Sequence, residues 1–284
     1  MTSCVNLPSV GFSPITLLTT GALVVLVTML GTASAVAADR LTDKDVKALI
    51  ERIDDERDRF EDQLDGEVKR SILRGPGGEV HVERYLDDLQ ENIKKLQERF
   101  SSEYAASAEV TAVLRQGADI SRFMATKPPN MDGASEWNRL AASLSQLAAV
   151  YGTSMPLPEG QVARRVNDHE VKVATTQVAK DADQFKKELD ASLKLDTSVT
   201  KATRDAAGKE VEELKADAKR LGSLAGDGRP ASGEARALLD RAAGIRGSMG
   251  GRTLSPPAKT AWAQIEKSLD KVALAFGLPA PGRP

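Results

Sequence analysis

The chain has 284 residues and a formal net charge of −2, from 39 lysines and arginines against 41 aspartates and glutamates. This balance argues against nucleic-acid binding, which usually requires a basic excess or a basic face. Aromatic residues make up 4% and charged residues 28% of the chain, a composition that suits long solvated helices better than a β-sandwich. The single cysteine, Cys4, excludes an internal disulfide framework, and with two histidines we expect no resident metal.

The first 38 residues carry no charged side chain. An apolar run over 15–30 is followed by small residues up to Ala38, and charge begins at Asp39. This pattern predicts a secretory signal peptide over 1–38, although residues 1–14 lack the usual lysine or arginine. Cleavage is expected after Ala35, Ala37 or Ala38, and the last two sites are favoured.

The alternative for the same segment is an uncleaved membrane anchor. Residues 15–38 are long enough to cross about 30 Å of hydrocarbon as a helix, but the alanine-rich end favours cleavage. We therefore expect a periplasmic or secreted protein, or alternatively one anchored to the inner membrane by residues 15–38. If the segment is removed, the mature chain contains no cysteine and does not depend on the redox state of its compartment.

Four helices are predicted in the part of the chain that follows. The first has apolar residues at helical spacing and Thr42 as its N-cap, and the second has a heptad seam from Val82 to Phe100. The four predicted ranges are Thr42–Leu73, Val80–Tyr104, Ala106–Met124 and Gly133–Tyr151. Proline and glycine in the segment 155–160 then interrupt the helical pattern.

The same pattern returns at an ungapped offset of 125 residues. Trp137 matches Trp262, and apolar positions match around both tryptophans. Asn167 is the expected N-cap of the first helix in this copy, and later helices are predicted at Ser232–Met249 and Pro257–Phe276. The sequence therefore predicts a duplicated four-helix module, with module 1 at 39–158, module 2 at 159–279 and a short tail at 280–284.

These elements predict an all-α fold, as two helical bundles or as one merged eight-helix body. Only the short stretch 79–83 alternates like a strand. Residues 39–158 have a net charge of −6 and residues 159–284 a net charge of +4. Opposite charges favour docking of the modules on each other, or head to tail on another molecule; drift on solvated faces after a duplication is the alternative.

The densest charged stretch, Glu51–Glu67, holds nine acids and three arginines. Hard cations take such oxygen ligands, but the stretch lacks a calcium-loop pattern, and a solvated helix face with i,i+4 pairs explains it better. His81 and His169 are not at matching positions, and neither belongs to a Glu-x-x-His motif, so surface positions are expected for both.

Two Ser-x-x-Lys matches occur, at Ser198–Lys201 and Ser268–Lys271, without the other elements of β-lactamase-like enzymes. We interpret both as chance matches, and the glycine-rich stretch 247–251 as a helix end. Trp137 and Trp262 are candidates to line a ligand pocket, but their apolar neighbours at helical spacing favour a core position.

The sequence thus assigns no catalytic, metal-ligating or cofactor-binding residue. It favours a non-enzymatic binding or scaffold protein of the bacterial envelope, with a protein partner or self-association, because long amphipathic helices suit such contacts. Membrane contact is expected only if the N-terminal segment is not cleaved. The alternative is a bundle that carries a small apolar ligand or a haem-like cofactor, and the third possibility is an enzyme whose site is assembled from distant residues.

Overall fold

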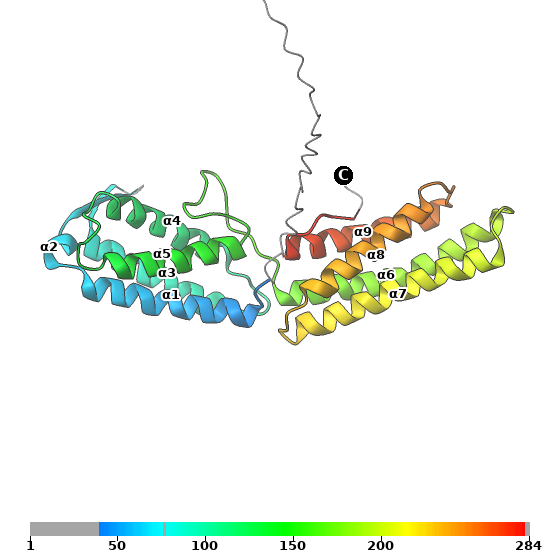
Figure 1. The fold of residues 1–284 in the computed structure, drawn as a ribbon, viewed down its shortest axis with the longest axis horizontal. Helices are drawn as coiled ribbons and strands as arrows, with labels where there is room; N and C mark the ends of the chain where they lie inside the picture. Colours follow the sequence, from blue (N-terminus) through cyan, green and yellow to red (C-terminus); the bar gives the residue numbers. More distant parts are fainter. Residues whose placement is uncertain (1–39, 76–77, 282–284) are drawn as a thin grey trace, which may run out of the picture. The chain divides into compact units, whose positions relative to one another are not determined.

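The structure, a computed structural model, describes residues 40–75 and 78–281 of the chain. Within these ranges the chain forms nine helices and one two-stranded antiparallel hairpin (Figure 1). The predicted all-α class is confirmed in this coarse sense. The predicted signal segment, 1–38, lies outside the described residues. None of the helices in the described ranges has the length and apolar character needed to cross a membrane.

The first half contains four long helices, one short helix and the hairpin. Its elements are α1 (Asp43–Gln63), α2 (Gly66–Lys69), β1 (Ile72–Gly75), β2 (Gly78–His81), α3 (Val82–Arg99), α4 (Ser107–Met124) and α5 (Ala134–Val150). Helix α1 packs on α3 and α5, and α4 also packs on α3 and α5. The four long helices therefore form a closed ring around one apolar core.

The second half consists of four helices in the same cyclic order. They are α6 (Asp168–Leu195), α7 (Lys201–Gly226), α8 (Ser232–Met249) and α9 (Pro256–Phe276). Helix α6 packs on α7 and α9, and α8 closes the ring against both. Both halves are helical bundles, and each has its own cluster of buried apolar side chains.

Matching capping boxes begin the first helix of each half, and their N-caps are the predicted residues Thr42 and Asn167. The side chain of Thr42 accepts a hydrogen bond from the amide of Asp45, whose carboxylate accepts one from the amide of Thr42. Asn167 and Glu170 make the same reciprocal contacts at the start of α6. These bonds satisfy amides that would otherwise lack a partner in the first turn.

The predicted helix over 42–73 is wrong beyond Gln63. Helix α1 ends at Gln63, and Asp65 caps the separate short helix α2 through the amide of Glu67. Gly66 follows Asp65 here, whereas Ala191 follows Asp190 in the uninterrupted helix α6. Glycine costs about 1 kcal/mol more than alanine inside a helix, which explains why only the first half breaks.

The hairpin occupies the chain that the prediction gave to the first helix and the following turn. Leu73 of β1 pairs with Val80 of β2 and is buried in the first core. The second predicted helix is also shorter than expected, because α3 begins at Val82, after the hairpin, and ends at Arg99. The other predicted long helices agree with the structure to within one residue at each end.

A tryptophan packs on a phenylalanine in each core. The ring centroids of Phe60 and Trp137 are 5.3 Å apart, and those of Phe185 and Trp262 are 5.1 Å apart, with interplanar angles of 51° and 49°. Both tryptophans are buried. The preference for a core role over a pocket role is therefore confirmed for Trp137 and Trp262.

Two tyrosines of the first half are buried with their hydroxyl groups satisfied. The Tyr85 hydroxyl donates a hydrogen bond of 2.5 Å to the buried carboxylate of Asp119, and the Tyr151 hydroxyl donates to the carbonyl of Ala105. Burial raises the pKa of Tyr85 well above its ordinary value, and the carboxylate of Asp119 adds to the effect. Burial likewise raises the pKa of Tyr151.

These shifts predict a loss of stability at alkaline pH. Above about pH 10 the tyrosines of the unfolded chain lose their protons while the folded chain keeps them, so the free energy of unfolding falls as the pH rises. We expect each tyrosine to contribute up to about 1.4 kcal/mol per pH unit to this fall. The free energy of unfolding can be measured with urea between pH 9 and 11. It should fall less steeply with pH in a Tyr85→Phe/Tyr151→Phe variant than in the native chain. It should fall as steeply as in the native chain in the control Tyr104→Phe, whose side chain is exposed. An equal fall in the double variant and the native chain would contradict the assignment.

Candidate functional site

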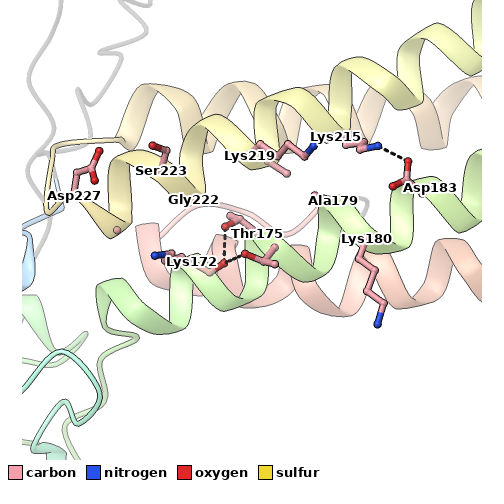
Figure 2. A pocket seen from close by; sticks show the side chains of 13 residues that line it. Lys172, Thr175, Ala179, Lys180, Asp183, Lys215, Lys219, Gly222, Ser223 and Asp227 are labelled. Atoms are coloured by element: carbon pink, nitrogen blue, oxygen red, sulfur yellow. Dashed lines mark hydrogen bonds and ion pairs between the residues drawn. The ribbon is translucent and has the colours of Figure 1, made fainter.

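A groove of about 600 Å³ runs between α6 and α7 on the surface of the second bundle (Figure 2). Its floor consists of small residues from both helices, among them Ala179, Ala218 and Gly222. Lysines from both helices border it. The groove therefore combines a shallow apolar floor with positively charged edges. Such a groove suits a long, negatively charged partner better than a compact ligand.

Close approach of the two helices depends on glycine in α7. A Cβ atom on Gly222 would lie 2.5 Å from the hydroxyl oxygen of Thr175 in α6, and one on Gly226 would lie 3.1 Å from Cδ of Lys172. Thr175 faces Gly222 across the gap, and its hydroxyl donates to the carbonyls of Val171 and Lys172. Any larger side chain at position 222 would push the helices apart.

The positive charge of the groove is mostly uncompensated. Lys215 pairs with Asp183, whose hydrogen bond raises the pKa of the lysine. In the described part of the chain, no carboxylate makes a salt bridge to Lys172, Lys180 or Lys219. Such free ammonium groups remain available for an anionic partner.

The corresponding face of the first bundle, between α1 and α3, has the opposite character. Residues 125 positions before Thr176 and Lys180 are Glu51 and Asp55. Amide side chains bridge the helices there: Gln97 donates to Asp54 at 3.1 Å and Gln90 to Asp58 at 3.5 Å.

Gly222 stands 125 positions after Gln97 and Ala179 stands 125 positions after Asp54, so the Gln97–Asp54 bridge has no counterpart in the second bundle. The Gln90–Asp58 bridge corresponds to the ion pair between Lys215 and Asp183. The cavity of the first bundle at this place holds only about 210 Å³. The open, basic groove is thus a property of the second bundle alone among the described helices.

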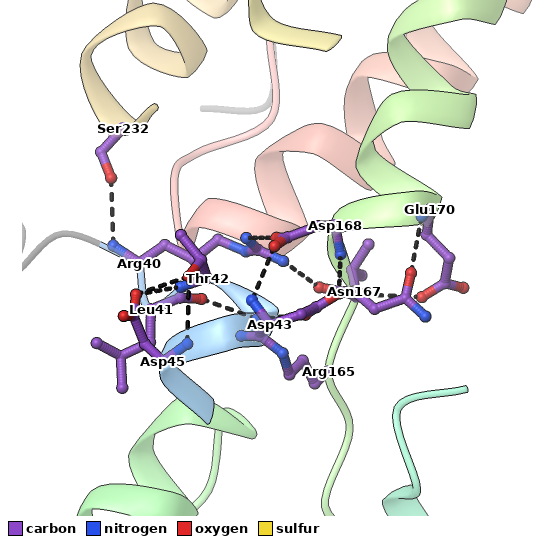
Figure 3. Close-up of polar contacts among 11 residues, drawn as sticks. Arg40, Leu41, Thr42, Asp43, Asp45, Arg165, Asn167, Asp168, Glu170 and Ser232 are labelled. Carbon is purple, nitrogen blue, oxygen red and sulfur yellow. Dashed lines mark hydrogen bonds and ion pairs between the residues drawn. The ribbon is translucent and has the colours of Figure 1, made fainter. Parts of the chain in front are cut away.

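A reciprocal set of contacts joins the starts of α1 and α6 (Figure 3). The amide of Asp43 donates to the carboxylate of Asp168 at 2.8 Å, and the amide of Asp168 donates to the carboxylate of Asp43 at the same distance. Each aspartate therefore caps the N-terminus of the other helix, where a carboxylate is favoured by the unpaired amides and the helix dipole.

Two arginines complete this set. Arg40 pairs with Asp168, and Arg165 pairs with Asp43 at 2.7 Å. The guanidinium of Arg40 also donates to the carbonyl of Val166, and that of Arg165 to the carbonyl of Leu41. All four charged side chains are at least 88% buried. Burial, and next the nearby charge of Arg165, lower the pKa of Arg40.

The sequence contains a signal for this junction. The tetrapeptides Arg-Leu-Thr-Asp at 40–43 and Arg-Val-Asn-Asp at 165–168 share arginine and aspartate at the same spacing. The groove lysines were also not singled out, because surface lysines on amphipathic helices carry no distinctive spacing. Their place on facing edges of α6 and α7 requires the helix pairing.

The acidic stretch 51–67 lies on the first two helices of the described chain. Its acids lie along α1 and α2, and the described residues contain no cluster of three or more histidine, cysteine, aspartate or glutamate side chains able to hold a metal ion. Arg57, inside this stretch, is instead buried, and its guanidinium pairs with Asp58 and Glu61.

The remaining sequence candidates lie apart from one another. His81 ends β2 and is exposed, with Nδ1 2.9 Å from the carbonyl oxygen of Arg70, and His169 is exposed at the start of α6. Ser198 hydrogen-bonds Asp196 before α7, and Ser268 is buried in α9. The glycine-rich stretch 247–251 spans the end of α8, with Gly250 as its C-cap.

Comparison of the chain with protein-family models, with curated proteins and with solved structures found no match.

The junction predicts a specific change in amide protection. Asp168→Ala removes the acceptor of the Asp43 amide, so we expect hydrogen exchange of that amide to accelerate at least tenfold, as measured by NMR. Asp43→Ala should have the same effect on the amide of Asp168. The matched control is Asp190→Ala, because Asp190 makes an exposed pair with Lys194 within α6. Unchanged exchange at residue 43 in the Asp168→Ala variant would show that the two helices are not capped reciprocally.

Proposed function

We propose that this chain is an exported, non-enzymatic binding protein of the bacterial envelope. In this proposal a signal peptide over 1–38 precedes two copies of a helical module, at 39–158 and 159–279. The duplication is supported by the common cyclic order of the long helices and by the 125-residue offset between the two Phe–Trp pairs. It is also supported by the reciprocal Arg–Asp contacts, whose members are separated by the same offset.

The groove between α6 and α7 is the observation that carries the binding function. Lys172, Lys180 and Lys219 make no salt bridge in the described structure, and small side chains line the groove between the lysines. We infer that the partner is a protein segment that is helical and acidic. Such a segment would lie along the groove, with its carboxylates beside Lys180 and Lys219.

The contrast between the two bundles supports the same conclusion. Gly222 of the second bundle stands where the first bundle has the bridging amide of Gln97. Lys180 and Lys215 stand where the first bundle has Asp55 and Gln90. These changes make one face of one module suitable for an anionic partner.

The groove can be tested with a labelled helical peptide of glutamate and alanine as the probe. We expect the full chain to bind it in a salt-dependent manner and Lys180→Glu/Lys219→Glu to weaken binding at least tenfold, as measured by fluorescence anisotropy. Lys259→Glu/Lys271→Glu on α9 changes the net charge equally and lies outside the groove, so its affinity should stay within twofold of the native chain. Equal losses in both variants would indicate general charge attraction and refute the groove.

Export makes a separate prediction about the N-terminus. Full-length protein produced in a bacterial host should be recovered from the envelope as a chain that begins after Ala35, Ala37 or Ala38, because the charge-free segment ends in small residues. Intact-mass spectrometry of the purified protein measures this directly. An intact mass that still includes residues 1–38 in the membrane fraction would favour the anchored alternative.

A further inference from the structure

A second cavity, of about 200 Å³, lies between α6, α7 and α8, away from the lysine groove. Its inner wall consists of the buried side chains of Leu189, Leu193, Ile245 and Met249. Glu210 and Arg252 are among the polar residues at its rim. An apolar interior with few polar groups at the mouth is the usual form of a small-molecule site.

Aromatic residues stand at two of the corresponding sequence positions in the first bundle. Tyr85 stands 125 positions before Glu210 and is buried, with its hydroxyl on Asp119. Phe123 stands 125 positions before Ser248 and packs against the first core. The second bundle thus replaces two aromatic rings by a glutamate and a serine, and Asp119 by Gly244, which leaves the cavity open.

Arg252 at the mouth of the cavity also differs from its counterpart in the first bundle, Lys127. In the first bundle the ammonium group of Lys127 lies 4.5 Å from the centroid of the Phe123 ring, a cation–π contact. Arg252 stands 125 positions after Lys127, but Ser248 offers it no ring. The Arg252 guanidinium instead makes one hydrogen bond, of 3.3 Å, to the backbone carbonyl of Ser248.

The carboxylates near the mouth already have other partners. Glu210 lies 3.5 Å from the guanidinium of Arg241, which also binds Glu213 and Asp217. Asp196 accepts hydrogen bonds from the amide and the hydroxyl of Ser198. Arg252 therefore retains donors suited to a planar carboxylate, which a guanidinium binds in a bidentate manner.

We propose that this cavity binds a small aromatic carboxylate. The ring of the ligand takes the place that Tyr85 and Phe123 fill in the first bundle, and its carboxylate pairs with Arg252. The cavity is somewhat larger than one of about 150 Å³ that accepts benzene, so it has room for one ring with a short arm. The proposal does not depend on the groove, because the two sites share no lining residue.

Phenylacetate is the probe for this site, and isothermal titration calorimetry of the full chain is the measurement. We expect one phenylacetate per chain, and at least tenfold weaker binding of acetate, which lacks the ring, and of 2-phenylethanol, which lacks the carboxylate. Arg252→Gln should weaken phenylacetate at least tenfold and leave 2-phenylethanol within twofold. Ser248→Phe introduces the ring of the first bundle and should weaken both compounds at least tenfold.

Two matched controls come from exposed positions on α8 outside the cavity. Arg236→Gln removes a guanidinium and Ala237→Phe adds a ring, and neither position lines the cavity. Both variants should bind phenylacetate as the native chain does. Circular dichroism checks that all variants fold. Lys180→Glu/Lys219→Glu should also bind phenylacetate normally, which separates this site from the groove. The proposal is overturned if the native chain binds no phenylacetate, if Arg252→Gln leaves its affinity unchanged, or if folded Ser248→Phe binds it normally.

Discussion

The reciprocal capping of α1 by Asp168 and of α6 by Asp43 is the interaction on which the relation between the two halves depends. A helix N-terminus has amides without partners, and a carboxylate there is stabilised by both hydrogen bonds and the helix dipole. Burying two carboxylates and two guanidinium groups together is tolerated because each charge has an opposite charge and a backbone partner. Loss of one member leaves a buried charge uncompensated, so these four residues act as a set.

The two halves resemble each other more in their cores than on their surfaces. Positions 60 and 137 keep the same aromatic pair as positions 185 and 262, with nearly the same separation and angle, because a close-packed interior tolerates little change in volume or shape. The faces of the first two long helices in each half have no such restriction. The face of α1 and α3 carries acids bridged by amides. The face of α6 and α7 carries the lysine groove for which we propose the binding function.

Much of the fold could be predicted from spacing alone. Helices with a clear apolar stripe, such as α8 and α9, were placed to within one residue, and the capping residues Thr42 and Asn167 were correct. The break after Gln63 was missed because the apolar period continues through Val68, although Gly66 removes the helical preference at that point. The hairpin was missed because each of its strands has only four residues, and the alternating stretch 79–83 overlaps the start of the predicted second helix.

The sequence by itself determined the helical class, the positions of most helices and the burial of both tryptophans, since these follow from local periodicity and from the insolubility of large apolar rings. It also contained the repeated Arg-x-x-Asp tetrapeptides, but not their purpose. Only the tertiary structure decided that Arg40 meets Asp168, that Lys172 and Lys219 border one groove, and that Arg252 stands at the mouth of an open cavity. Each of these sites joins residues from different parts of the chain. Local periodicity predicts which side of its own helix a side chain lies on, but it does not specify which other helix packs against that side.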